Sequence, residues 1–465
     1  MSRPGRKRPP TARTPRQDRG GERKDQPIEL RALSIESLES EGRGVARDDG
    51  KVVFVEGALP GEVVEARTTR RGAAFDQART VRILRESASR REPRCPHFGM
   101  CGGCTTQHAD GRTQMAAKQR WLEDSLQRIG KVTPETLLPI VYGEEWGYRH
   151  RARMAVRGLP PPRGALVGFH EKKSSFVADM KQCENLPPQI SRLIPHLRAL
   201  VTGLDMRERM PQVEVAVGDM IDVLVIRNLD PLSDRDAECL RAFADKEGVW
   251  LWLQPKGPAT AAPFHPLSMP ELDYTLPEFG IRIAFQPTDF TQVNHGINRI
   301  LVRRAVRMLD PQPGDRVADL FCGIGNFSLP LAAGGATVVG IEGSEDLVGR
   351  ARTNADANGL ASRATFECAD LFDVDEKKLT EWGPFEKVLI DPPRSGAAEL
   401  AKALPDAWPR RIVYVSCEPS TLARDAGILV HARGFRLMAA GVVNMFPHTT
   451  HVESIALFER DAPES

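Results

Sequence analysis

From about residue 286 onward, short apolar segments alternate regularly with helical segments, and this alternation constrains the fold more than any other feature. The pattern is typical of a parallel, doubly wound sheet with helices on both faces. Ligands of such sheets bind beyond the carboxyl ends of the strands. The side chains that follow each apolar segment are therefore the first candidates for a functional site.

Glycines and acids occupy these positions. The segment DRVADLF (315–321) leads into CGIGNF, where Gly323 and Gly325 allow a close approach of the backbone to a ligand. TVVGIE ends at Glu342, ATFECAD ends at Asp370, and a carboxylate after the second strand suits ribose hydroxyls. The third glycine of a dinucleotide site is missing, which favours an adenosine-bearing ligand without phosphates, such as S-adenosylmethionine, over NAD. The alternative is that both acids only cap strands or helices.

The fifth apolar segment, RIVYVSC (411–417), ends at Cys417. Its two apolar faces are those of a central parallel strand, so Cys417 is expected at the ligand-binding edge of the sheet. Cys322 and Cys368 are instead expected to be small core side chains.

Three further cysteines cluster as Cys95-x5-Cys101-x2-Cys104, and Cys183 could supply a fourth thiolate. Gly102 and Gly103 allow the backbone to fold around a metal. Four thiolates suit zinc or an iron–sulfur cluster equally well, so the spacing leaves that choice open. The spacing differs from the C-x3-C-x2-C motif of radical enzymes, which favours a structural or RNA-positioning role.

The remaining chain divides by composition. Residues 1–26 are predicted to be a disordered basic tail, because the first 25 residues hold nine Lys or Arg and three acids. The tail is either a solubilising extension or an electrostatic arm for phosphates. Residues 27–88 resemble a TRAM-type RNA-binding β-barrel. Residues 89–285 are predicted to form an α+β domain that carries the cysteines, and its helical stretch at 107–138 is expected to pack on the catalytic domain. Residues 286–465 form the predicted doubly wound α/β domain.

In YRHRARMAVR, strand alternation places four arginines on one face: Arg149, Arg151, Arg153 and Arg157. The row is either a phosphate track or a solvated strand face. No apolar run is long enough to cross a membrane, and the first residues lack the apolar core of a signal peptide. We therefore expect a cytoplasmic monomer without membrane contact or an obligate protein partner.

Five segments together resemble the RNA uracil-C5 methyltransferase family: FQPTDFTQVN (285–294), DLFCGIGNF (319–327), VLIDPPRSG (388–396), VYVSCEPSTLARD (413–425) and NMFPHTTHVES (444–454). With the four cysteines and the barrel, the chain looks most like the branch that modifies 23S ribosomal RNA. The resemblance covers about residues 28–460. It implies that Cys417 is the nucleophile, that Glu453 is the general base, and that Cys95, Cys101, Cys104 and Cys183 hold a [4Fe–4S] cluster. It assigns six residues to the S-adenosylmethionine and reaction pocket: Gln292, Phe321, Asn326, Glu342, Asp370 and Asp391.

Two alternatives stay open. The Asp391-Pro392-Pro393-Arg394 turn also occurs in tRNA-modifying relatives, so the same chemistry on a tRNA uridine is the first. A non-catalytic RNA-binding scaffold is the second, and the intact pair of Cys417 and Glu453 argues against it. In HVESIALF, Glu453 begins an otherwise apolar strand face, and such surroundings raise a carboxyl pKa toward the range of a base.

Overall fold

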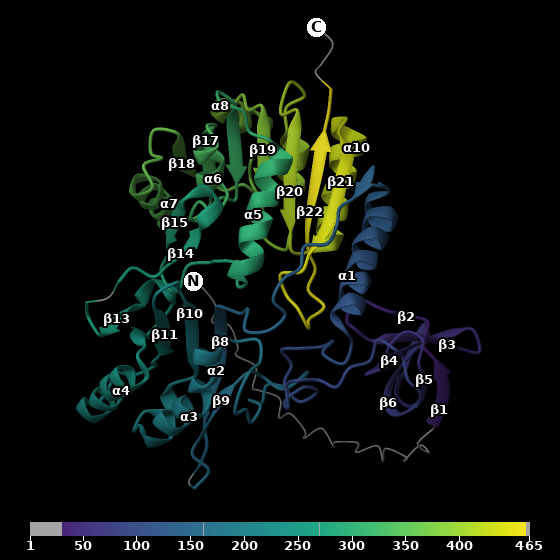
Figure 1. Cartoon of the computed structure of the whole chain (residues 1–465), viewed down its shortest axis with the longest axis vertical. Helices are drawn as coiled ribbons and strands as arrows, with labels where there is room; N and C mark the ends of the chain where they lie inside the picture. Colours follow the sequence, from purple (N-terminus) through teal and green to yellow (C-terminus); the bar gives the residue numbers. More distant parts are fainter. Residues whose placement is uncertain (1–29, 161, 269, 462–465) are drawn as a thin grey trace, which may run out of the picture.

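The computed structural model describes residues 30–160, 162–268 and 270–461. The predicted basic tail, residues 1–26, lies outside the described residues. Three β-rich units follow one another along the chain (Figure 1). Within the described ranges, no helix combines the length and apolar character needed to span a bilayer.

The first unit is a six-stranded sheet in the order β1-β5-β6-β4-β3-β2. Because side chains alternate along its strands, small and β-branched side chains such as Val53, Val55 and Val64 point to the same side and pack in one core. This is the predicted barrel. Its strands are β1 (Leu30–Ser34), β2 (Ser37–Leu38), β3 (Gly44–Asp48), β4 (Lys51–Glu56), β5 (Val63–Arg71) and β6 (Phe75–Arg85).

The predicted helical stretch forms α1 (Gly111–Ser125), which continues as a π-helical turn over Leu126–Gly130. Asp110 caps its start by accepting a hydrogen bond from the amide of Thr113. The helix leaves the barrel and runs alongside α10 (Pro419–Arg433) and β21 (Arg436–Val443) of the C-terminal unit (Figure 1). Leu122 and Leu126 share a hydrophobic core with that unit.

The central unit is a mixed sheet in the order β13-β12-β11-β10-β8-β9, covered by α3 (Leu193–Gly203) and α4 (Asp234–Glu247). A short helix, α2 (Pro188–Ser191), precedes α3. The strands are β8 (Arg151–Gly158), β9 (Ala165–Gly168), β10 (Gln212–Val217), β11 (Asp222–Arg227), β12 (Trp250–Gln254) and β13 (Ala262–His265). The arginine row lies along and before β8, but two of its members have protein partners. Arg151 donates to the Pro287 carbonyl, and Arg153 forms an ion pair with Glu214.

The C-terminal sheet has eight strands in the order β18-β17-β16-β19-β20-β22-β21-β7. Strands β16 to β20 are parallel, as predicted, but β22 is antiparallel to both neighbours. A strand buried on both faces has no period that reveals its direction. The strands are β7 (Thr136–Leu137), β16 (Arg316–Leu320), β17 (Thr337–Glu342), β18 (Ala364–Cys368), β19 (Lys387–Ile390), β20 (Arg411–Ser416) and β22 (Glu453–Glu459).

Helices cover both faces of this sheet: α5 (His295–Leu309), α6 (Ser328–Ala333), α7 (Glu345–Ala357), α8 (Glu376–Trp382), α9 (Ala398–Ala403) and α10. The hairpin of β14 (Asp273–Leu276) and β15 (Ile281–Ala284) also packs on its core, although it precedes the predicted boundary at 285. Of the two cysteines expected in the core, Cys322 is buried. The expectation for Cys368 is wrong, because it is exposed at the end of the edge strand β18.

Candidate active site and a neighbouring cavity

The cavity at the carboxyl ends of strands β16 to β20 is lined by every residue predicted for the cofactor and reaction pocket. It measures about 530 Å3. Its wall includes Gln292, Phe321, Asn326, Glu342, Asp370, Asp391, Cys417 and Glu453. We call it the reaction cavity.

One end of the reaction cavity contains two carboxylates held by backbone amides and two neighbouring aromatic rings. The Glu342 carboxylate accepts hydrogen bonds from the amides of Gly323 (3.2 Å) and Ser344 (3.1 Å), which fix its orientation. The Asp370 carboxylate accepts from the amide of Phe372, whose ring lies 5.5 Å from that of Phe321. Among the described residues that line the cavity, Arg394 is the only lysine or arginine. Aromatic rings and carboxylates that can accept hydrogen bonds from ribose hydroxyls, without a cluster of cations for a phosphate, suit an adenosine group that carries no phosphate.

The other end holds the cysteine and the acid. Cys417 directly follows β20 and Glu453 begins β22, one position beyond the last registered pair, Ser416 with Ser454. Antiparallel pairing therefore brings together two residues that are distant in sequence. The Glu453 side chain is buried, with 3% exposed.

Burial and mutual charge set the protonation of this end. Burial, reinforced by the Asp391 charge, raises the pKa of Glu453 well above its usual range. Burial also raises the pKa of Asp391 to about 7. For Cys417, burial and the charges of Glu453 and Asp391 raise the thiol pKa to about 11, while the Arg394 guanidinium acts in the opposite direction. The cysteine is therefore a protonated thiol at neutral pH.

The same cavity is also lined by aromatic and cationic side chains that were not predicted, among them Tyr274, Phe290, Arg394, Phe446 and His451. Four of them lie inside the motifs quoted above, so a closer look at those motifs could have found them. Tyr274 lies outside every motif and donates from its hydroxyl to the Asn326 side chain. Nothing in the sequence around Tyr274 indicated this role.

Segment 444–452, which leads from β21 to Glu453, is held mainly by residues outside its own domain. The buried Lys118 of α1 donates from Nζ to the Asn444 side chain and to the Phe446 carbonyl, both at 2.8 Å. Burial lowers the pKa of Lys118 to about 7. The Gln114 side chain accepts from the His448 amide at 2.8 Å and contacts its ring.

The cysteine-rich loop holds the same segment. The amides of Thr105 and Thr106, next to Cys104, donate to the His448 carbonyl. The Trp146 ring stacks on the His448 ring at 3.8 Å. His448 has a left-handed backbone (φ 64°), a conformation that costs a non-glycine residue energy and needs such support.

A second cavity, of about 250 Å3, is lined by all four predicted thiols: Cys95, Cys101, Cys104 and Cys183. We call it the cysteine cavity. Burial raises the pKa of Cys104 to about 11 and that of Cys183 to about 12, and the neighbouring cysteine charges act in the same direction. Asn185 donates to the Cys104 sulfur at 3.3 Å. In the part of the chain that the structure describes, no three Cys, His, Asp or Glu side chains are close enough to hold a metal ion.

The two cavities are neighbours. His451 lines both, and its Nδ1 lies 3.1 Å from Nη2 of Arg394 in the reaction cavity. Burial, together with the charge of Arg394, lowers the pKa of His451, so its ring is neutral.

Comparison with known proteins agrees with this architecture. The chain resembles the Pyrococcus abyssi tRNA (uracil-54, C5)-methyltransferase in complex with S-adenosyl-L-homocysteine, with a TM-score of 0.71 and 23% identity over 92% of this chain and all of that one. Residues 275–461 match the tRNA (Uracil-5-)-methyltransferase family, and residues 29–71 match the TRAM domain. The fold is that of a methyltransferase.

Curated relatives narrow the class. The 23S rRNA (uracil(1939)-C(5))-methyltransferase RlmD of Nitrosospira multiformis is 59% identical over 92% of this chain and 98% of its own length. The protein of the same name from Cupriavidus necator is 57% identical over 92% of this chain and 100% of its own length. The chain therefore belongs to the RlmD family of RNA uracil-C5 methyltransferases, and the predicted family is confirmed.

Proposed function

We propose that this protein transfers a methyl group from S-adenosylmethionine to carbon 5 of a uridine in 23S ribosomal RNA. The observation that carries the proposal is the placement of Cys417 and Glu453 at the adjacent ends of neighbouring strands, inside the cavity that also contains Glu342 and Asp370. The names of the curated relatives support the choice of RNA.

The proposed cofactor site uses the predicted residues. Glu342 and Asp370 bind the ribose hydroxyls and the adenine edge, and Phe321 packs on the nucleoside. Gln292 and Asn326 orient the polar end, and Asp391 lies between cofactor and uracil. When bound, S-adenosylmethionine supplies an electrophilic methyl group. The polar groups of Asn326 are already fixed by Tyr274 and Asn298, which favours a preformed site.

Cys417 acts first. Carbon 5 of uracil is a weak nucleophile, and addition of the Cys417 sulfur to carbon 6 converts the ring to an enolate that is reactive at carbon 5. The thiol must first lose its proton to solvent, since burial and the adjacent carboxylates favour its protonated form. The charge of the Arg394 guanidinium favours the thiolate.

Glu453 acts last. After methylation, carbon 5 still carries its hydrogen. The Glu453 carboxylate takes that hydrogen as a proton, the ring double bond re-forms, and the Cys417 sulfur leaves as a thiolate. Its raised pKa makes the Glu453 carboxylate a stronger base than an exposed one. The proton then passes to solvent.

We also propose that Cys95, Cys101, Cys104 and Cys183 bind one [4Fe–4S] cluster. The proposal is supported by the four thiols of two separate segments that line a single cavity of about 250 Å3, although no three of them are close enough in this structure to hold a single metal ion. The cluster would tie the loop of residues 95–104 to Cys183 and would take no part in methyl transfer. Anaerobically purified protein should contain about four irons and absorb broadly in the visible range. Stoichiometric zinc without iron would show that this assignment is wrong.

A tRNA uridine is the second candidate, because the matched family and the Pyrococcus abyssi structure are both named for tRNA. Labelled methyl incorporation from S-adenosylmethionine into separated 23S rRNA and tRNA distinguishes the two. We expect label in 23S rRNA as 5-methyluridine, and none with Cys417→Ala. Label in tRNA alone would show that tRNA, and not 23S rRNA, is the substrate. No label in either RNA would favour the non-catalytic RNA-binding scaffold.

A further inference from the structure

The loop of residues 391–397, which we call the Arg394 loop, is attached to helix α10 by a buried carboxylate. Asp391 and Arg394 of this loop line the reaction cavity. Asp425 of α10 is fully buried and accepts a hydrogen bond from the Ala397 amide at 2.7 Å. The end of the loop is therefore bound to the helix that begins two residues after Cys417.

Both carboxylate oxygens of Asp425 have partners. Oδ2 also accepts from the Tyr414 hydroxyl at 2.7 Å, and Oδ1 accepts from Nε of Arg424 at 2.8 Å. Nη2 of the same guanidinium donates to the Ser395 carbonyl at 2.8 Å. Tyr414 lies on β20, three residues before Cys417. One carboxylate therefore joins the Arg394 loop to the strand and the helix on either side of Cys417.

Gly396 shows how closely the loop approaches this network. Its backbone is left-handed (φ 74°), and a Cβ there would lie 2.6 Å from Nη2 of Arg424 and 2.6 Å from Oδ2 of Asp425. Such distances are shorter than van der Waals contact, so a side chain at this position would push the loop away from the helix. The loop and the network are therefore packed without space between them.

The position of the loop matters because of the charge that it carries. Burial and two carboxylates raise the thiol pKa of Cys417, and the Arg394 guanidinium is a group whose charge opposes this rise. The effect of a cation on a thiol falls with distance. His451 contacts only the tip of the Arg394 side chain, with 3.1 Å between Nδ1 and Nη2. The backbone of Arg394 is instead held through the residues that follow it, which Asp425 and Arg424 contact.

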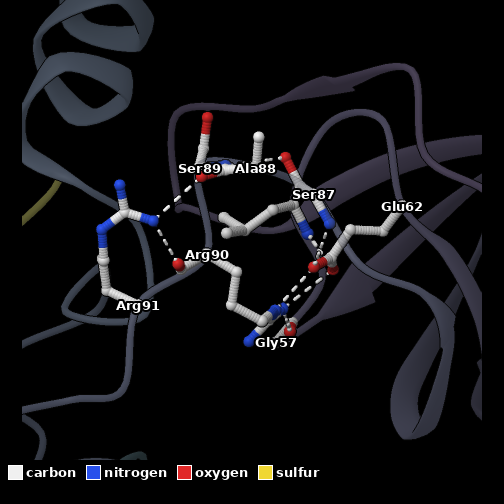
Figure 2. A network of polar contacts seen from close by, with 8 residues as sticks. Gly57, Glu62, Ser87, Ala88, Ser89, Arg90 and Arg91 are labelled. Atoms are coloured by element: carbon white, nitrogen blue, oxygen red, sulfur yellow. Dashed lines mark hydrogen bonds and ion pairs between the residues drawn. The ribbon is translucent and has the colours of Figure 1, made fainter.

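A second buried pair of a carboxylate and an arginine provides a structural counterpart. The fully buried Glu62 accepts from the guanidinium of Arg90 at 2.5 and 2.8 Å and from the amides of Leu59 and Ser87 (Figure 2). This pair joins the barrel to the segment that follows it, and both residues lie outside the lining of the reaction cavity. The two carboxylates are alike in burial and in their partners, so Glu62 is the matched control for Asp425.

We propose that Asp425 is a positioning residue for the reaction: it holds the Arg394 loop so that the Arg394 guanidinium stays close to the Cys417 sulfur. Asp425 acts through the Ala397 amide and through Arg424, and not by contact with the substrate. This role accounts for the Arg424-Asp425 pair that ends the segment VYVSCEPSTLARD. The inference rests on the proposed function in taking the Cys417 thiolate as the reacting group.

Alkylation of Cys417 in the whole protein tests this role without RNA. Iodoacetamide reacts with the thiolate, so the rate at about pH 8, followed by mass spectrometry of the Cys417 peptide, measures the thiolate fraction. We expect Asp425→Asn and Gly396→Ala each to slow this alkylation about fivefold. Glu62→Gln should leave the rate unchanged. Gly359→Ala is the control for Gly396→Ala, because Gly359 has a similar φ (69°) and nothing within 4 Å of where a side chain would start.

Coupling to Arg394 separates positioning from a general loss of structure. Arg394→Ala should itself slow the alkylation, and Asp425→Asn added to it should cause no further slowing. In the single variant Asp425→Asn, adduct formation on saturating 5-fluorouridine RNA should also slow about fivefold, with the Kd for S-adenosylmethionine within about twofold. Equal slowing with and without Arg394, equal slowing in Glu62→Gln, or a wild-type rate in Asp425→Asn would overturn the proposal.

Failure of this inference is distinguishable from failure of the proposed function, because the alkylation needs no RNA. If the protein methylates 23S rRNA but Asp425→Asn is alkylated at the wild-type rate, only the positioning role is wrong. If the alkylation rates change as expected but no RNA is methylated, the proposed function is wrong and the connection from Asp425 to the thiol is supported. Should Asp425→Asn fail to fold, Gly396→Ala with its Gly359→Ala control decides the same question.

Discussion

The reaction cavity and the cysteine cavity differ in how the chain builds them. The first is formed by residues that end successive strands of one sheet, such as Glu342, Asp391 and Cys417, so the backbone pairing of that sheet fixes their positions. The second is formed by loops, with Cys104 and Cys183 brought together from two segments that belong to no common sheet.

This difference predicts different dependence on a bound group. Strand ends hold their geometry without a ligand, whereas a loop lined with buried thiols needs one to be stable. Segment 444–452 connects the two cavities, because it contains His451 and leads to Glu453. Its contacts come from α1 and the cysteine-rich loop. The sheet thus positions Cys417, and the loops position the segment that leads to Glu453.

The largest effects should separate the nucleophile from the base. Cys417→Ala should reduce methylation by at least about 10^4-fold and form no covalent RNA complex. Glu453→Gln should slow turnover by roughly 10^2- to 10^4-fold, yet accumulate a methylated RNA–protein adduct that survives denaturing electrophoresis. The adduct should disappear in the double variant. Near-normal methylation by Cys417→Ala would refute the covalent mechanism.

The next effect concerns pH. Because the thiol pKa of Cys417 is raised to about 11, the thiolate fraction increases with pH throughout the neutral range. Adduct formation on 5-fluorouridine RNA in a single turnover should therefore accelerate roughly a hundredfold between about pH 7 and pH 9. Quenched-flow gel analysis measures it. A rate that is already constant below about pH 8 would mean that bound RNA lowers the thiol pKa by itself.

Loss of one thiol should affect the loops and spare the sheet. Cys104→Ala should lose iron, lower the melting temperature by about 10 °C and weaken RNA binding roughly tenfold. The Kd for S-adenosylmethionine should stay within about twofold, since its site lies at strand ends. Calorimetry and iron analysis test this, with the exposed Cys368→Ala as control. An equal loss of cofactor binding would remove the distinction between the two cavities.

The smallest effect should come from the contact that joins them. Lys118→Met removes the hydrogen bonds to Asn444 and Phe446 but relieves the burial of an amine, so the melting temperature should change by only a few degrees, about one kcal/mol. The kcat should fall about fivefold with an unchanged KM for RNA, because segment 444–452 loosens next to Glu453. A small amount of trapped adduct with unmodified RNA should appear. A change in KM alone would assign Lys118 to RNA binding instead.

The sequence predicted the sheet and the strand-end residues because each of those depends on a local pattern: an apolar run and the residue after it. Glu342, Asp370 and Cys417 were found in this way. The direction of β22 could not be predicted, since its buried faces look alike in either orientation. The burial of Lys118 could have been predicted from one further feature of the sequence. Gln114, Lys118 and Leu122 are spaced by four, so two polar side chains share the helix face that Leu122 buries.

The antiparallel pairing of β20 with β22 determines which insertions and deletions the chain can accept. One added residue inside Ser454–Glu459 would shift the register and turn Glu453 to the opposite face of the sheet, away from Cys417. Between α10 and β21, by contrast, the chain passes through Gly434 with nothing within 4 Å of where a side chain would start, so added length there leaves the register untouched. Homologues and engineered variants should therefore vary in length at that turn and keep the last strand invariant in length.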